Sequence, residues 1–174
     1  MSVFLGRPGS IVWRPGQPTL PVDAPLPLQP SKTPVAARND ERDPPTLVTR
    51  ILWMFQLARP LYDLLDLQRD GGHPKDYSKV DKLHQKMLDV EDSKPAVFRS
   101  ENPDRRWDNY PGMHWLENSR LYFKQLHYFG LIALHRRYMF HRKQSRTAAL
   151  KASIHMLDIQ KRSFQGLDPA SWRK

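Results

Sequence analysis

The sequence predicts an all-α fold, an irregular helical bundle that follows an extended, proline-rich N-terminal arm. Apolar residues recur at three- and four-residue spacing in several segments after residue 45, and no segment shows the period-two alternation typical of a half-buried strand. Ten of the sixteen prolines lie in residues 1–45. Because proline fixes φ and removes a backbone donor, residues 1–45 are predicted to be an irregular arm and residues 46–174 a helical domain.

The first helix is predicted over residues 47–65. Thr46 is the expected N-cap, and Pro60 should kink the helix because its ring removes one amide donor. Gly71-Gly72 then breaks the chain. The apolar positions that give this segment its helical spacing are Leu47, Val48, Ile51, Leu52, Phe55, Ala58, Leu61, Tyr62 and Leu65.

Two more helices are predicted, one before residue 91 and one after residue 140. The earlier one is short and covers residues 80–90, and Ser78 followed by Asp81 resembles a capping box at its start. A polar connection rich in proline occupies residues 91–113. Ser145 is the predicted cap of the last helix, whose alanines allow close packing and which ends at Asp168-Pro169.

A central helix is predicted from Trp115 to Phe140. Its middle part, Leu121–Leu134, contains no acidic residue and a single lysine, and its apolar side chains are spread around the whole helical wheel. A helix that is apolar on every side must be buried on every side. The other predicted helices supply only part of that cover, so the bundle is expected to belong to a larger helical domain.

The basic charge of the chain is concentrated in its last third. Residues 119–174 hold twelve Lys and Arg but two Asp and Glu, which accounts for the whole formal net charge of +10. A possible polyanion or partner contact follows from this clustering. The favoured alternative is a solvated helix end, where cations stabilise the negative pole of the helix. The candidate residues are Arg136, Arg137, Arg142, Lys143 and Arg146.

The sequence offers little support for catalysis or metal binding, so a non-enzyme is predicted. Without cysteine, disulfides and thiolate metal sites are excluded. His127, His135 and His141 lack the four-residue spacing that places two imidazoles on one metal, and no glycine-rich phosphate loop or nucleophile elbow is present. Asp63, Asp66 and Asp70 lie at helical spacing and could act together in acid–base catalysis, but they are more simply explained as the solvent-exposed face of their helix. No apolar run reaches the roughly 20 residues that span a bilayer, and no membrane partner is expected.

Several segments, in order, resemble the fungal-specific transcription factor domain, the middle homology regulatory region of fungal zinc-cluster transcription factors. Leu5-Gly6-Arg7-Pro8 resembles the first signature of that family. Two positions depart from the family pattern: Lys94 replaces a leucine, and Arg137 stands where proline is frequent. The other similar segments are Pro95–Arg99, Asn102-Pro103-Asp104, Trp107-Asp108, Trp115 to Arg120, Leu134-His135-Arg136 and the small residues Ser145, Ala148 and Ala149.

The resemblance implies the C-terminal part of a non-catalytic regulatory domain that acts on transcription in the nucleus. In the family, the Leu-Gly-Arg-Pro signature follows several helices of the same domain, so Met1 is expected to be internal to a longer protein. The family's zinc is held by an upstream six-cysteine segment, and this cysteine-free chain is therefore expected to bind no cofactor. Its expected partners are proteins or upstream helices, with DNA contacted only through the missing zinc cluster.

Two other functions stay open at the level of sequence. The chain could be an independent basic helical module that binds nucleic acid through residues 136–146 and their neighbours, in which case the affinity should fall steeply with added salt. It could also be a helical enzyme of unknown type, although no motif supports that class.

Overall fold

The computed structural model describes residues 20–25, 29, 32, 36–69 and 77–165, the last three of these by their backbone alone. Four α-helices make up most of this described part of the chain. They are α2 (Leu47–Arg69), α3 (Ser78–Asp92), α4 (Trp115–His135) and α5 (Lys143–Gln165), and a short 3-10 helix, η1 (Ala96–Phe98), lies in the connection before α4. Within these ranges there is no strand, so the predicted all-α fold is confirmed.

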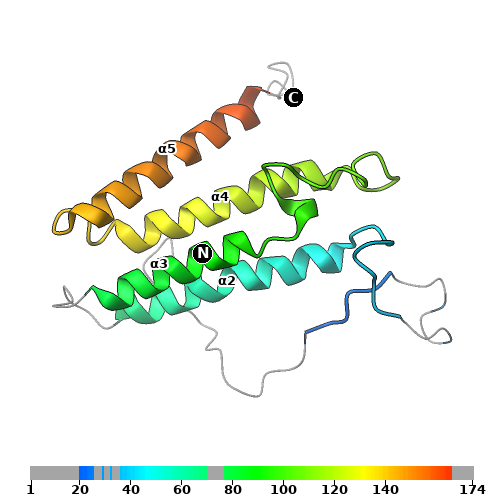
Figure 1. Cartoon of the computed structure of the whole chain (residues 1–174), viewed down its shortest axis with the longest axis horizontal. Coiled ribbons are helices and arrows are strands. Elements are labelled where there is room, and N and C mark those ends of the chain that lie inside the picture. The colour runs from blue at the N-terminus through cyan, green and yellow to red at the C-terminus, as the bar shows by residue number, and fades with distance from the viewer. Residues whose placement is uncertain (1–19, 26–28, 30–31, 33–35, 70–76, 166–174) are drawn as a thin grey trace, which may run out of the picture.

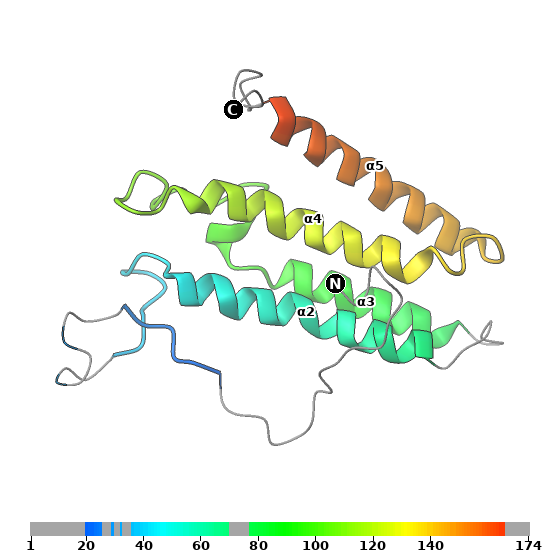
Figure 2. The same cartoon turned by 180° about the vertical axis from the view of Figure 1, so that it is seen from behind.

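Helix α4 is the central element of the bundle. The pair α2 and α3 lies along one side of α4, and α5 lies along the other (Figures 1 and 2). The enclosure of α4 is nevertheless complete only near its C-terminal end, where Gly130, Leu131 and Leu134 are buried. Residues 124–129 are half-buried because α5 diverges from α4 toward its own C-terminus (Figure 1). The expectation of burial on every side therefore holds for the last part of α4 only.

Two hydrophobic clusters divide the core along α4. The first joins the C-terminal half of α4 to α2, α3 and α5, and the second joins its N-terminal half to α2 and η1. Each large side chain buried in such a cluster contributes about 1.5–3 kcal/mol relative to exposure. The buried members of the first are Leu64, Val80, Leu83, Met87, Leu131, Ala133, Leu134, Tyr138 and Ala152. Those of the second are Trp53, Leu57, Phe98, Leu116 and Phe123, with Trp107 and Trp115 half-buried against them.

The start of α2 agrees with the sequence and is tied to the arm. The Thr46 hydroxyl oxygen accepts hydrogen bonds from the backbone N–H groups of Val48, at 3.0 Å, and Thr49, at 3.2 Å, which confirms the predicted cap. The same hydroxyl donates to Asp23 at 2.6 Å, and the Thr49 hydroxyl donates to the other oxygen of Asp23 at 2.7 Å. These bonds hold the described part of the arm against the helix. Pro60 is buried inside α2, which runs through it to Arg69.

The predicted starts of two helices need correction. The N-cap of α3 is Tyr77, with no side-chain capping bond, so Ser78 is the first helical residue rather than the cap of a box with Asp81. Helix α5 begins at Lys143, and Ser145 therefore lies in its first turn, fully buried. The Ser145 hydroxyl is not available as a cap because it is engaged with His135, 3.1 Å away.

The central helix also ends earlier than predicted. It stops at His135, and residues 136–141 form a series of turns that reverse the chain toward α5. The backbone N–H of Tyr138 donates to the carbonyl of His135 at 3.0 Å, which closes the first of these turns. Tyr138 is buried and its ring meets that of Tyr77 edge-on, with centroids 5.8 Å apart. Packing of this tyrosine into the core fixes the reversal. The predicted end of the last helix, at Asp168-Pro169, lies outside the described residues.

Candidate functional site

The basic residues singled out in the sequence mostly hold the end of the bundle together. Arg137 donates to the carbonyl of Gln68 near the end of α2, at 3.0 Å. Arg146 donates to the carbonyl of Met139 in the turn, at 3.1 Å. Of the five candidate cations, only Arg136 and Lys143 are exposed without a partner among the described residues.

Arg142 is the most strongly held of the basic residues. Its guanidinium donates to both carboxylate oxygens of Asp81 on α3, at 2.8 and 2.7 Å, and lies over the ring of Tyr77 at 4.9 Å from the centroid. Both bonds come from the same guanidinium nitrogen, Nη2, so the pair is charge-assisted but is not a two-nitrogen fork. The arrangement favours the structural interpretation of this basic segment, since three of its five cations are used inside the protein.

A buried chain of polar side chains connects α3, α4 and α5. His84 Nδ1 lies 2.9 Å from His135 Nε2, and His135 Nδ1 lies 3.1 Å from the Ser145 hydroxyl. His135 and Ser145 are buried, whereas His84 is half-buried. The hydroxyl and the two imidazoles can satisfy one another in one consistent set of tautomers. This chain joins the three helices where α4 ends and α5 begins.

Burial disfavours the charged form of both histidines. Loss of solvation lowers the pKa of His135 from 6.5 to about 4, with smaller contributions in the same direction from His84 and Arg142 and an opposing one from Asp81. Burial also lowers the pKa of His84, against the opposing attraction of Asp81. The Ser145 hydroxyl is fully buried, so it is a structural partner of His135 rather than a nucleophile facing solvent.

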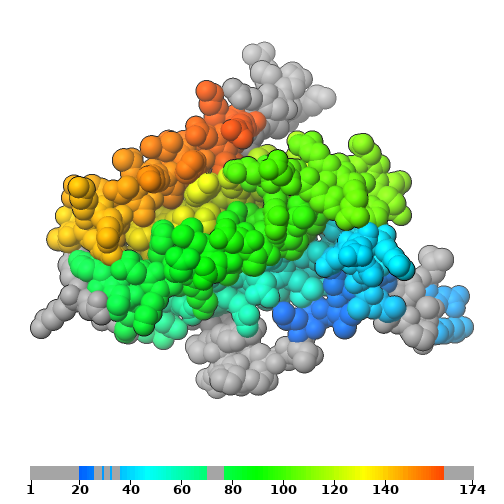
Figure 3. Space-filling model, viewed as in Figure 1, coloured from blue at the N-terminus to red at the C-terminus, as the bar shows by residue number. Residues whose placement is uncertain are grey.

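A groove opens beside this chain, between α5 on one side and α3 and α4 on the other. Figure 3 shows the surface of α4, in yellow, receding between the orange of α5 and the green of α3. The groove has a volume of about 450 Å³. Its floor is apolar and its rim is basic or neutral. The lining residues are His84, Tyr128, Leu131, Lys143, Gln144, Thr147, Ala148, Lys151, Ala152 and His155.

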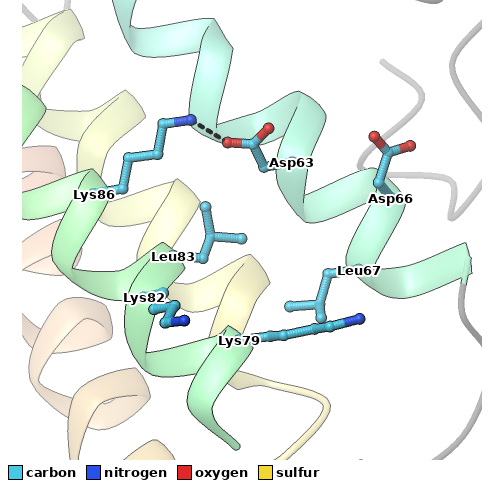
Figure 4. Close-up of a pocket in the computed structure, with 7 residues that line it drawn as sticks. All are labelled: Asp63, Asp66, Leu67, Lys79, Lys82, Leu83 and Lys86. Atoms are coloured by element: carbon cyan, nitrogen blue, oxygen red, sulfur yellow. Dashed lines mark hydrogen bonds and ion pairs between the residues drawn. The ribbon is translucent and has the colours of Figure 1, made fainter.

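A second cleft, between α2 and α3, contains two of the three predicted acidic residues. Asp63 and Asp66 line it together with Lys79, Lys82 and Lys86, and its volume is about 360 Å³. Figure 4 shows Lys86 reaching across to the carboxylate of Asp63, with which it forms an ion pair. Both acids are exposed, as expected for the wet face of α2. Asp70 lies outside the described residues.

Three segments that carry the family resemblance, Pro95–Arg99, Asn102-Pro103-Asp104 and Trp107-Asp108, are held against the start of α4 as one framework. Arg120, buried on α4, donates to the carbonyl of Val97 at 2.8 Å, to the carbonyl of Asp104 at 3.1 Å and to both carboxylate oxygens of Asp108, at 2.9 and 2.6 Å. Phe98 packs against Phe123 with ring centroids 5.0 Å apart. These residues position the connection against the start of α4. The signature Leu5-Gly6-Arg7-Pro8 lies outside the described residues.

The departure at Lys94 is buried in this framework. The side chain of Lys94 is 1% exposed, and its ammonium forms an ion pair with Glu91. Burial lowers the pKa of Lys94, and the hydrogen bond that its ammonium donates to Glu91 opposes that shift. The other Glu91 oxygen lies 3.8 Å from Nδ1 of His127, whose pKa is lowered by burial. The side chain of His127 is 8% exposed, so His127 is a polar residue of the core.

Sequence reasoning did not identify His84 or the groove. His84 follows Val80 by four residues and precedes Met87 by three, so helical spacing alone places it beside the packed face of α3. That spacing is the signal that could have marked it. Its partner His135 is 51 residues away, and no pattern in the sequence pairs the two.

Comparisons with known proteins found no match for this chain. The chain matches no protein-family model, no curated protein and no solved structure. Among the described residues, no group of three or more His, Cys, Asp and Glu side chains is placed to hold a metal ion. None of the helices in the described ranges is long and apolar enough to cross a membrane.

Proposed function

We propose that this chain is part of a non-catalytic transcription-regulatory domain of the fungal zinc-cluster type, acting in the nucleus through contacts with protein partners or with further helices of the same domain. The observation that carries the proposal is a pair of apolar stripes on the outer faces of α2 and α5. In a helical bundle, such a stripe is the surface that another helix covers.

The stripe on α2 consists of Leu47, Ile51 and Phe55. These side chains are 59%, 45% and 43% exposed, and they lie at i, i+4 and i+8 on the side of α2 opposite the buried Trp53 and Leu57. The spacing places all three on one face for two turns. A partner helix would find a continuous apolar ridge there.

The stripe on α5 consists of Leu150, Ile154 and Leu157, which are 60%, 50% and 64% exposed. It faces away from α4, because the residues of α5 that pack on α4 include Ala149 and Ala152. Three large apolar side chains aligned on one exposed face exceed the scattered exposure that is normal for a surface. Two outward stripes on opposite sides of the bundle support a module that docks helices.

The resemblance adds the regulatory role. The residues that carry it, around Arg120 and Phe98, form one framework and face inward, whereas the stripes face outward. In such a domain, a partner binds at the exposed stripes while the inward-facing framework keeps the helices in place. The effect on transcription comes from the bound partner. Nuclear location follows from the same resemblance.

Fusion of the chain to a heterologous DNA-binding domain tests this proposal. A reporter gene in a fungal host should respond to the fusion, in either direction, and the double variant Leu150→Asp/Ile154→Asp should remove that response because charges on the stripe exclude an apolar partner. The double variant Asn109→Asp/Asn118→Asp adds the same charge at exposed positions outside the stripes and the groove, and should respond like the wild type. A reporter that ignores the wild-type fusion, or an equal loss in both variants, would reject the proposal.

The nucleic-acid alternative makes the opposite prediction for the purified chain. If residues 136–146 bind DNA or RNA, then Arg136→Gln/Lys143→Gln should weaken binding at low salt, since these are the two cations of the segment without an internal partner in the described ranges. Our proposal expects no binding to DNA or RNA through this segment. Affinity that depends on these two residues would replace the protein-docking function with nucleic-acid binding.

A further inference from the structure

The groove between α5 and the pair α3 and α4 has the construction of a small-molecule site. Its volume, about 450 Å³, lies in the range of roughly 300–1,000 Å³ that such sites occupy. Leu131, Ala148 and Ala152 form its floor, and the two alanines keep it open because they lack long side chains. A ligand body that lies on this floor would be apolar.

Within the described part of the chain, the rim of the groove carries positively charged side chains and no negatively charged ones. Lys143 and Lys151 line it from α5, and neither ammonium has an ion-pair partner among the described residues. No acidic residue lines the groove. Two acids on the neighbouring elements are paired with other cations, Asp81 with Arg142 and Glu101 with Lys124, each pair at 2.7 Å.

Aromatic and imidazole groups complete the site. The rings of Tyr128 and His155 stack with centroids 5.0 Å apart and planes within 16°. His84 stands at the α3 side of the groove and connects it to the buried His135. The rim can therefore meet an anionic group with ammonium and imidazole donors while the floor holds an apolar body.

From this geometry we infer that the groove binds a small amphipathic carboxylate, with the apolar part on Leu131, Ala148 and Ala152 and the carboxylate between Lys143 and Lys151. The site is distinct from the stripe on α5, since Leu150, Ile154 and Leu157 do not line the groove, so the inference does not depend on the proposed regulatory function. It assigns a ligand class to a face of the molecule that partner helices leave uncovered.

Decanoate, used below its micelle concentration, is the probe. Calorimetry with the full chain should show binding at one site, and decanol, which has the same chain without the charge, should bind at least about tenfold more weakly. Lys143→Gln/Lys151→Gln should weaken decanoate binding by about tenfold, since two partly solvated ion pairs are lost. Both lysines are exposed, so the melting temperature should stay unchanged.

The cleft between α2 and α3 provides a matched control. Lys82→Gln/Lys86→Gln removes the same charge from another cleft and should leave decanoate affinity unaltered. Ala148→Trp should fill the groove and abolish binding, and Leu150→Gln/Ile154→Gln, on the outer stripe, should have no effect. Equal binding of decanol and decanoate, wild-type affinity in the Lys143/Lys151 variant, or an equal loss in the Lys82/Lys86 variant would each overturn the inference.

Discussion

At the scale of single residues, the ion pair of Lys94 and Glu91 shows how a charge is tolerated in the core. Lys94 is almost completely buried, and Glu91 retains 24% of its side-chain exposure. A buried ammonium without a counter-charge is strongly unfavourable, whereas an apolar side chain in the same space needs no partner. The two members of the pair should therefore differ in their sensitivity to substitution.

We predict that Glu91→Gln lowers the free energy of unfolding by about 3 kcal/mol, because Lys94 then stays buried without a counter-charge. Lys94→Met should change it by less than about 1 kcal/mol, since Glu91 can turn toward solvent and the methionine fills a similar volume. Urea denaturation measures both. Asp89→Asn, an exposed substitution on the same helix, is the control, and an equal loss in the two core variants would contradict this account.

His135 gives the protein a dependence on pH. Its pKa is about 4 in the folded chain and 6.5 as the ordinary value, so the unfolded state takes up a proton between these values that the folded state does not. The free energy of unfolding should therefore fall as the pH drops from about 6.5 to 4, by roughly 3 kcal/mol at most from this residue. Above about pH 6.5, His135 is neutral in both states, and this loss of stability is absent.

The measurement is urea denaturation at several pH values. His135→Gln should be less stable than the wild type at pH 7, because the contacts to His84 and Ser145 are disturbed, but its stability should decline less between pH 6.5 and 4. Carboxylates with lowered pKa, such as Asp108 beside Arg120, lose their contribution at lower pH and affect both proteins equally. Parallel curves for the two proteins would exclude His135 as the titrating group.

At the scale of elements, the connection before α4 depends on Arg120. Its guanidinium bonds to two backbone carbonyls and one carboxylate of residues 97–108, and lysine cannot reproduce that planar fork. Arg120→Lys should increase amide hydrogen exchange across residues 97–110 and lower stability by about 2–4 kcal/mol. Arg106→Lys, at an exposed pair with Asp104, should change neither. Exchange confined to the ends of the helices would argue against the role of Arg120.

The elements also show which features the sequence could predict. Helix α2 and its cap at Thr46 follow from local spacing and local hydrogen bonds, and so they were predicted correctly. The end of α4 was placed five residues late, because the apolar pattern continues through Tyr138 while the backbone has already turned. Ser145 looks like a cap in sequence, but its hydroxyl bonds to His135 on another helix. Contacts between residues far apart in the sequence determine where α4 ends and what the Ser145 hydroxyl bonds to. The same kind of contact forms the groove, so local sequence patterns could not predict these features.

At the scale of the whole molecule, α2 and α5 lie on opposite sides of α4 (Figure 1), and each carries an exposed apolar stripe. A second copy of the chain is a poor cover for the α5 stripe, since Arg146, Lys151 and Lys161 would meet the same cations on the other copy. Contact between the α2 stripe of one copy and the α5 stripe of the next would not close a symmetric dimer, and would extend into an open assembly.

The isolated chain should therefore bind a hydrophobic dye such as ANS while melting cooperatively, because the stripes are exposed on a packed core. Ile51→Gln/Phe55→Gln and Leu150→Gln/Ile154→Gln should each remove part of the dye signal, and their combination most of it. Stability should change by less than about 1 kcal/mol, since these side chains are already in contact with water. Circular dichroism reports the fold, and light scattering reports concentration-dependent association that the combined variant should lack. A wild-type chain that melts cooperatively as a monomer and binds no dye would show that the stripes do not behave as an uncovered interface, and would remove the main support for a helix-docking function.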